Sequence, residues 1–369
     1  MAKKIDLILL GATGSLLVFG ILMIASVSAS FSQEKFGTTY YYLNHQLINI
    51  LIGLTLGFFA FKIKLDLLKK WAPFLLLGNI VLMLMVFLPV IGFSAGGATR
   101  WLNLGFTSIQ PSEFLKLTFI IYLASWLSTR TSSKNKLGDR DRNKNFSQTF
   151  LAFLMVLGIV GIFLFLQPDL STFIIILLVA TILYFVAQTP FWHIGVLFLT
   201  CDGGLVLLGS TASYRMKRIL VFLKPETDPM GIGYQVKQAL IAVGSGGIFG
   251  LGLGMSRQKF GFLPASMTDS IFAVIAEETG FLGCSILMAL FLTFLWRGFK
   301  IGKNSQDNFL KFTAFGITSW ILIQTLINIS SMTGLFPLAG IPLPFFSYGG
   351  SAIITELVGV GILLNISKT

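Results

Sequence analysis

Three carboxylates in the stretch 264–280 are the residues whose type and spacing could do chemistry in this chain. Asp269 opens a long apolar run, and Glu277 and Glu278 interrupt that run further along. If the run is a helix, its rise of roughly 1.5 Å per residue places the two glutamates about 12–14 Å beyond Asp269. Charged groups in a membrane segment are costly and usually functional. Asp269, at the mouth of the run, is therefore the candidate catalytic residue.

These carboxylates also have a structural interpretation. Asp269 could act only as a carboxylate at a helix N-terminus, where it satisfies a free amide and favours the helix dipole. Glu277 and Glu278 lie deeper in the run. We predict that they form a buried, hydrogen-bonded pair that supports helix packing.

The composition indicates a membrane protein. Of the 369 residues, 54% are hydrophobic and 11% are charged, and the mean hydropathy is +0.83; a soluble domain usually carries about 25% charged residues. Neither the two cysteines nor the two histidines form a metal-ligating or redox motif. We predict an all-α polytopic membrane protein whose single domain spans residues 1–369.

Apolar stretches that approach the roughly 20 residues needed to cross a bilayer predict ten transmembrane helices. The first, 7–27, follows two lysines and resembles a signal peptide, but it is longer than the usual apolar core of about 7–15 residues. We therefore expect it to remain as a helix. The other predicted helices span 46–62, 71–91, 113–129, 148–166, 170–188, 190–209, 269–296, 310–332 and 350–366.

The 27 lysines and arginines predict the orientation. Most of them, including the basic loop 130–147, fall on one side of the membrane, so the positive-inside rule places both termini in the cytoplasm. The net charge of +12 thus reflects topology, and no nucleic-acid partner is predicted. A long outer loop, 210–268, joins the seventh and eighth helices and mixes cations with aromatic residues, which suits a surface of anionic lipid headgroups. Loops of this length are often functional.

Two other outer stretches contain unusual residues. In the first, Lys116 lies about one turn inside a predicted helix, spaced to pair with Glu113 on the same face. A purely structural ion pair is the alternative. In the second, 334–351, prolines and glycines interrupt the helical pattern, which is tolerated at membrane depth where protein or water surrounds the backbone. We expect a re-entrant turn that lines a cavity, with Glu356 buried in the helix that follows.

The glycine-rich segment 244–254 does not predict nucleotide binding. It lacks the Gly-Lys-Ser/Thr ending and the preceding soluble strand of a P-loop.

The motifs GATRWLNLG, QPSE, GYQVKQALIAVGSGGIFGLGLG, QKFGFLP, TDSIFAVIAEETG and PLPFFSYGGS occur in this order. Together they resemble the SEDS family (shape, elongation, division and sporulation) over nearly the whole chain. The resemblance implies ten helices in the bacterial cytoplasmic membrane and a peptidoglycan glycosyltransferase that polymerises lipid II. It also implies partners: a class B penicillin-binding protein, the undecaprenyl-linked glycan strand and other division proteins. The essential aspartate of the family's Thr-Asp motif falls on Asp269.

Some positions favour one branch of the family, and others depart from its pattern. Residues 26–30, 233–235 and 258–259 are closer to the division member than to the elongation member, which is the alternative. Ala265, Met267 and Ser270 stand where the family commonly has Glu, His and Phe, which could alter how Asp269 packs. The pair at 338–339, Leu-Ala, replaces a Thr-Lys pair of some division members and so removes one phosphate-binding cation.

The implied chemistry is attack by a sugar hydroxyl on an anomeric carbon that bears a polyprenyl pyrophosphate. A positioned base contributes about 10²–10⁴-fold to such a step. We predict Asp269 as that base, with a pKa raised by desolvation and lowered by nearby cations. The predicted substrate-binding residues are the cations Arg100, Lys116, Arg215, Arg218 and Lys259, which could neutralise pyrophosphate, together with Gln110, Ser112, Glu113, Gln235, Ser347, Gly349, Gly350 and Ser351. No cofactor is required, although a divalent cation could assist the pyrophosphate.

Two other functions remain open at this stage. Buried carboxylates and broken helices also occur in secondary transporters, so a flippase for lipid II is an alternative. No internal repeat supports it. A scaffold without activity that recruits a division partner is the third possibility, because the TDSI context of Asp269 is unusual.

Overall fold

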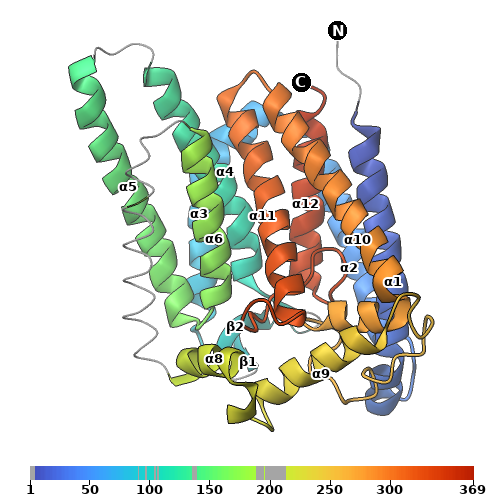
Figure 1. Cartoon of the computed structure of the whole chain (residues 1–369). Helices are drawn as coiled ribbons and strands as arrows, with labels where there is room; N and C mark the ends of the chain where they lie inside the picture. Colours follow the sequence, from blue (N-terminus) through green and yellow to red (C-terminus); the bar gives the residue numbers. More distant parts are fainter. Residues whose placement is uncertain are drawn as a thin grey trace.

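The computed structural model describes residues 5–89, 91–95, 98–103, 105, 108–134, 139–187, 195 and 213–369, without the side chains of 95, 132–134, 139–149 and 213–215. Long helices run side by side, and a layer of short elements covers one end of the bundle (Figure 1). The long helices are α1 (Leu7–Phe36), α2 (Tyr41–Lys62), α3 (Leu65–Met85), α4 (Pro111–Lys134), α5 (Asp139–Leu166), α6 (Leu170–Val186), α10 (Ile271–Asn304), α11 (Asn308–Met332) and α12 (Gly350–Ile366).

These helices confirm the polytopic helical fold. Five of them, α1, α2, α3, α10 and α11, are long and apolar enough to cross a membrane, and the apolar parts of α5, α6 and α12 are shorter. Each predicted span has a helix at its position except 190–209, which lies outside the described residues apart from Gly195.

The covering layer was predicted only as loops. It contains α8 (Ser213–Leu223), the 3₁₀ turn η1 (Pro225–Thr227) and α9 (Ile232–Ser245), all inside the predicted loop 210–268. It also contains a small antiparallel sheet in the order β1 (Gly92–Ala95), β2 (Ala98–Asn103), β3 (Ser108–Ile109). Leu102 pairs with Gly92 on one side and with Ile109 on the other. The fold therefore departs from the all-α prediction by this one sheet.

The opposite end of the bundle brings both termini together (Figure 1). Asp6 caps α1 by accepting a hydrogen bond from the Leu9 amide at 3.0 Å, and its carboxylate also accepts from Arg297 Nε near the end of α10. The Asp6 amide donates to Ser367 Oγ, just after α12, at 3.3 Å. Asp6 thus connects the ends of three helices, two through its carboxylate and the third through its main-chain amide.

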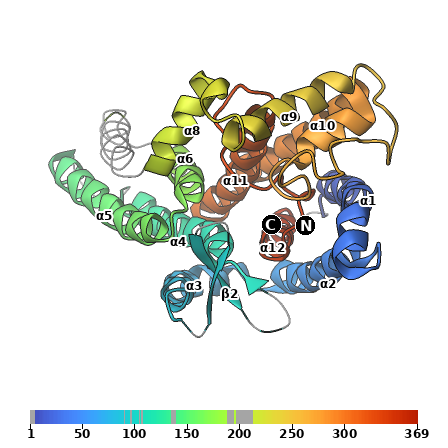
Figure 2. The ribbon, with the colours of Figure 1, turned by 90° about the horizontal axis from the view of Figure 1, so that it is seen from below.

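Helix α12 lies near the middle of the bundle and contacts α1, α2, α4, α10 and α11 (Figure 2). Its approach to α2 is close because glycines meet: a Cβ added at Gly361 would lie 2.1 Å from the Gly57 carbonyl oxygen. Small residues let membrane helices approach in this way. Gly78 in α3, by contrast, has no atom within 4 Å of such a Cβ.

We expect Gly361→Ala to destabilise the protein although alanine favours helices. The backbone clash should lower the free energy of unfolding by about 1–3 kcal/mol. The matched control Gly78→Ala should be neutral or stabilising by up to about 1 kcal/mol. Thermal unfolding in detergent measures both, and equal effects of the two variants would contradict this packing.

Candidate active site

Asp269 lies in the turn directly before α10, at the end of the bundle that carries α8, α9 and the sheet. The helix begins at Ile271, two residues later than predicted, so Asp269 is outside the membrane-spanning segment. The residue at the N-cap is Ser270, and its side chain makes no capping bond; its Oγ contacts Gln235 Nε2 at 3.0 Å instead. Gln235 of α9 thereby contacts the residue that follows Asp269, and its role toward substrate stays a prediction.

The main chain around Asp269 is held by α11 and by the segment 333–349. Asn328 Nδ2 on α11 donates to the carbonyl oxygens of Asp269 at 2.8 Å and of Ile341 at 2.7 Å. Ser347 Oγ donates to the Thr268 carbonyl oxygen at 2.6 Å. Asn328 was missed by the sequence interpretation. An amide residue within a predicted transmembrane helix was the signal that could have found it.

The segment 333–349 has no regular secondary structure, as expected for a re-entrant turn. Its Gly340 has φ +65°, and a Cβ added there would lie 3.5 Å from Asp269 Oδ2 and 3.4 Å from Arg218 Nη2. Arg218 Nη1 also donates to the Ala339 carbonyl oxygen at 3.0 Å. Asp269 and Arg218 therefore both face Gly340, and an added Cβ would be in van der Waals contact with both.

Burial and neighbouring charges set the basicity of Asp269. Burial raises its pKa from 3.8 to about 6, Arg218 and Arg100 act in the opposite direction, and Asp169 and Glu113 add to the rise. The carboxyl is consequently ionised at neutral pH, yet it is a stronger base than an ordinary aspartate. This is the property expected of a general base.

Arg100 reaches the site from β2. Its Nε donates to the Gln167 carbonyl oxygen at 2.9 Å, and its guanidinium also contacts the Pro168 carbonyl oxygen. The next residue, Asp169, accepts from Ser112 Oγ at 2.9 Å. The sequence interpretation missed Asp169. A polar Gln-Pro-Asp triplet between two apolar runs was its signal.

A pocket of about 260 Å³ opens between these elements. Arg100 and Arg218 supply its charge, and most of its wall is apolar. Ala339 and Ile341, which flank Gly340, line it, so the pocket lies beside Asp269. The remaining lining residues are Pro168, Leu170, Ser171, Ile174, Ile219, Ile327, Phe336, Pro337 and Leu338. An anion attached to an apolar chain fits this combination.

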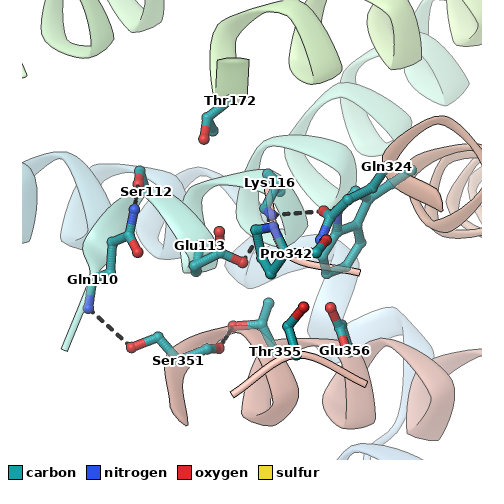
Figure 3. A network of polar contacts seen from close by, with 12 residues as sticks. Gln110, Ser112, Glu113, Lys116, Thr172, Gln324, Pro342, Ser351, Thr355 and Glu356 are labelled. Atoms are coloured by element: carbon teal, nitrogen blue, oxygen red, sulfur yellow. Dashed lines mark hydrogen bonds and ion pairs between the residues drawn. The ribbon is translucent and has the colours of Figure 1, made fainter. Parts of the chain in front are cut away.

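Lys116 lies at the centre of a buried polar network (Figure 3). Its Nζ is 2.8 Å from Glu113 Oε2, which confirms the predicted ion pair, and 2.8 Å from Gln324 Oε1. The ring of Trp320 lies 5.2 Å away, and Gln324 Nε2 donates to the Pro342 carbonyl oxygen. The network therefore links α4 and α11 to the re-entrant segment. Substrate binding by Lys116 or Glu113 stays a prediction.

Several predicted binding residues join the loops of this end to one another. The Gln110 amide donates to Ser351 Oγ at 2.9 Å, and Gln110 Nε2 donates to Ser112 Oγ at 3.1 Å (Figure 3). Gly349 donates to Gln46 Oε1. These contacts gather the motifs in one place, and the roles of these residues and of Gly350 toward substrate stay predictions.

Lys259 is not among the charges that act on Asp269. It is buried, and its Nζ lies 3.2 Å from Glu278 Oε1 and 3.3 Å from Ser26 Oγ. Glu277 accepts hydrogen bonds from the main chain of the same loop. The two glutamates thus contact α1 and the loop before Asp269, and their predicted supporting role rests on these contacts. The side chain of Arg215 lies outside the described residues.

Among the residues that the structure describes, no group of three or more His, Cys, Asp and Glu side chains could hold a metal ion. The groups around Asp269 that could bind an anion are the two arginines of the pocket.

The chain matches the model of the cell cycle protein family of FtsW, RodA and SpoVE over residues 7–369. Stage V sporulation protein E of Bacillus subtilis is 40% identical over 366 residues, which cover 98% of this chain and 97% of that protein. The probable peptidoglycan glycosyltransferase FtsW of Coxiella burnetii is 38% identical over 358 residues, which cover 96% and 94%.

Solved structures agree with these relatives. A chain from a peptidoglycan synthase complex that coordinates polymerization and crosslinking superposes with a TM-score of 0.78 at 25% identity, covering 99% of this chain and 98% of its own. The rod shape determining protein RodA of Thermus thermophilus superposes with a TM-score of 0.70 at 25% identity, covering 99% and 97%.

Replacement of Asp269 by asparagine should stabilise the fold at neutral pH. Because the folded pKa is about 6 and the ordinary value is 3.8, the ionised carboxylate destabilises the folded state above about pH 6, and this cost fades as the pH falls toward 4. Asp269→Asn should therefore gain on the order of 1–2 kcal/mol at pH 7.5, after allowance for solvent screening. Thermal unfolding at pH 7.5 and pH 4.5 measures the difference. A gain that grows on acidification would show that burial does not raise this pKa.

Proposed function

This chain belongs to the cell cycle protein family of FtsW, RodA and SpoVE, and on that basis we propose that it is a peptidoglycan glycosyltransferase that polymerises lipid II into glycan strands. One observation carries the proposal: the basic carboxylate of Asp269 adjoins Arg218 across Gly340, beside the pocket that contains both arginines. A base and a cationic pocket are the two parts that this transfer needs.

Asp269 acts as the general base. A sugar hydroxyl of the acceptor gives its proton to the Asp269 carboxylate as its oxygen bonds to the anomeric carbon of the donor. The bond between that carbon and the pyrophosphate oxygen breaks, and polyprenyl pyrophosphate leaves. A single displacement of this kind inverts an α-linked donor to a β-linked product.

The two arginines of the pocket act on the leaving group. Negative charge develops on the pyrophosphate as the bond breaks, and guanidinium groups that are already in place stabilise it. Arg100 is held by the carbonyl oxygens of 167–168 and Arg218 by that of Ala339, so neither needs to be ordered during the reaction. The apolar wall of the pocket suits the first part of the polyprenyl chain.

We place Asp269 on the extracytoplasmic side of the bacterial cytoplasmic membrane and both termini in the cytoplasm. The common position of the two chain ends at the pole opposite Asp269 and the basic inner loops support this orientation. The likeness to a chain of a peptidoglycan synthase complex supports a class B penicillin-binding protein as the partner.

Asp269→Asn should lower the rate of polymerisation of purified lipid II by about 10²–10⁴-fold, because the base is lost. Asp228→Asn makes the same change at another outer carboxylate, which accepts from the Ile232 amide and pairs with Lys217 at 3.1 Å. That control should polymerise normally. Glycan product resolved by gel electrophoresis measures the rates, and the wild-type rate should rise with pH through about 6.

Reconstitution of the protein into liposomes tests the transporter alternative. With fluorescent lipid II, the enzyme should make polymer without moving lipid II across the bilayer. Wild-type polymerisation by Asp269→Asn would refute the assignment of the base, and movement of lipid II without polymer would refute the enzyme.

A septal role in cell division is the finer proposal. The relatives named FtsW and the sporulation protein support it over the elongation role of RodA. A fluorescently tagged copy should gather at midcell before constriction. Distribution along the side wall would favour the elongation role.

A further inference from the structure

The loop 247–262 buries polar side chains and exposes apolar ones, which is the reverse of a loop that faces water. Its charged and amide side chains Gln258 and Lys259 are 7% and 5% exposed. Its large apolar side chains point outward, and the only charged side chain exposed with them is that of Arg257. The outward apolar residues are Ile248, Phe249, Leu251, Leu253, Met255, Phe260 and Phe262, from 45% to 78% exposed. Exposed apolar patches of this kind mark an interaction surface.

Hydrogen bonds hold the loop in this orientation. The main-chain amides of Leu251 and Gly252 donate to the carbonyl oxygens of Glu277 and Glu278 at 2.9 and 3.1 Å. The ion pair of Lys259 with Glu278 holds the far side of the loop from within. The apolar side chains are therefore displayed by a fixed backbone.

The loop lies beside the part of α10 where the helix changes from buried to exposed. The first turns of α10, up to Gly280, are buried, and exposure begins at Phe281 (72%) and Leu282 (53%). The amides of these two residues donate to the carbonyl oxygens of Gly247 and Ile248 at 2.9 and 3.0 Å. The apolar surface of the loop is thus continuous with the exposed apolar face of a membrane-spanning helix.

The other end of α10 marks one boundary of the membrane, from which the depth of the loop can be measured. Trp296 is exposed there, with Arg297 and Lys300 each 5.3 Å from its ring, an arrangement typical of the membrane–water boundary. A hydrocarbon layer of about 30 Å corresponds to about 20 helical residues. The helix breaks at Gly280, where φ is +64°, and its continuous part from Phe281 to Trp296 spans roughly 24 Å of that layer. The second boundary therefore lies close to this break, at the level of the loop.

We propose that residues 247–262 form a membrane-inserted rim, whose apolar side chains enter the lipid leaflet beside the site while Arg257 meets the phosphates of the headgroups. A lipid surface satisfies the exposed apolar groups and the single cation together. The rim runs into the turn of Asp269, so it sets the height of that turn above the hydrocarbon. This inference does not rest on the proposed enzymatic function.

Spin-label accessibility in liposomes of phosphatidylethanolamine and phosphatidylglycerol tests the rim. Single nitroxide labels are placed by Phe249→Cys, Leu253→Cys and Phe260→Cys in a Cys201→Ser, Cys284→Ser background. Met230→Cys, at a 91% exposed turn before α9, is the control for water, and Leu292→Cys, 59% exposed within α10, is the control for lipid. Power saturation compares collisions with oxygen and with a water-soluble nickel chelate.

The rim labels should behave as the Leu292 label does, with several-fold higher preference for oxygen than the Met230 label shows. Preference for the nickel chelate would overturn the proposal and show that the surface faces water, where a protein partner could bind it. Shielding from both reagents would overturn it in favour of contact with a second copy. Labels at Ile248 and Met255 replace any position whose variant does not elute as a folded, monodisperse protein.

Discussion

The amide group of Asn328 joins the two segments that make the candidate site. Its two donor bonds connect the carbonyl oxygens of Asp269 and Ile341, which are far apart in the chain. Buried main-chain carbonyls that leave helical geometry need another hydrogen-bond partner, and here a side chain supplies it. Asn328 does so from helix α11, and its bond helps to fix the position of the Asp269 turn. Gly340, next to Ile341 in the chain, has a positive φ of +65° and faces Asp269 and Arg218.

The same constraint explains how the other buried charges are arranged. Glu113 pairs with Lys116, Glu278 pairs with Lys259, and each pair also has hydrogen-bonding neighbours. Burying one charge alone is costly, whereas a paired and hydrogen-bonded charge is tolerated. These pairs link helices and loops. Asp269 differs from them, because burial outweighs its two arginines and leaves a carboxyl with a raised pKa.

The outer end of the protein combines three surfaces within one small region. The pocket with Arg100 and Arg218 suits an anion on an apolar chain, the turn of Asp269 holds a carboxyl of raised pKa, and the rim 247–262 continues the apolar face of α10. A lipid-linked sugar would keep its chain in the membrane while its pyrophosphate reaches the arginines. Under the proposed function, this arrangement would let the transfer take place at the membrane surface while the chain of the substrate stays in the bilayer.

The sequence by itself determined the helical membrane fold, and it predicted a common side for the termini and a role for Asp269, because hydropathy, charge bias and an isolated carboxylate are local signals. Only the tertiary structure decided which distant residues meet. Lys259 and Arg218 both appear as cations of one basic loop, yet Lys259 pairs with Glu278 and Arg218 faces Asp269 across Gly340. Asn328 and Asp169 escaped notice because their importance comes from bonds to segments far along the chain. The small sheet at 92–109 was also missed, since its short strands pair with one another and carry no long periodic pattern.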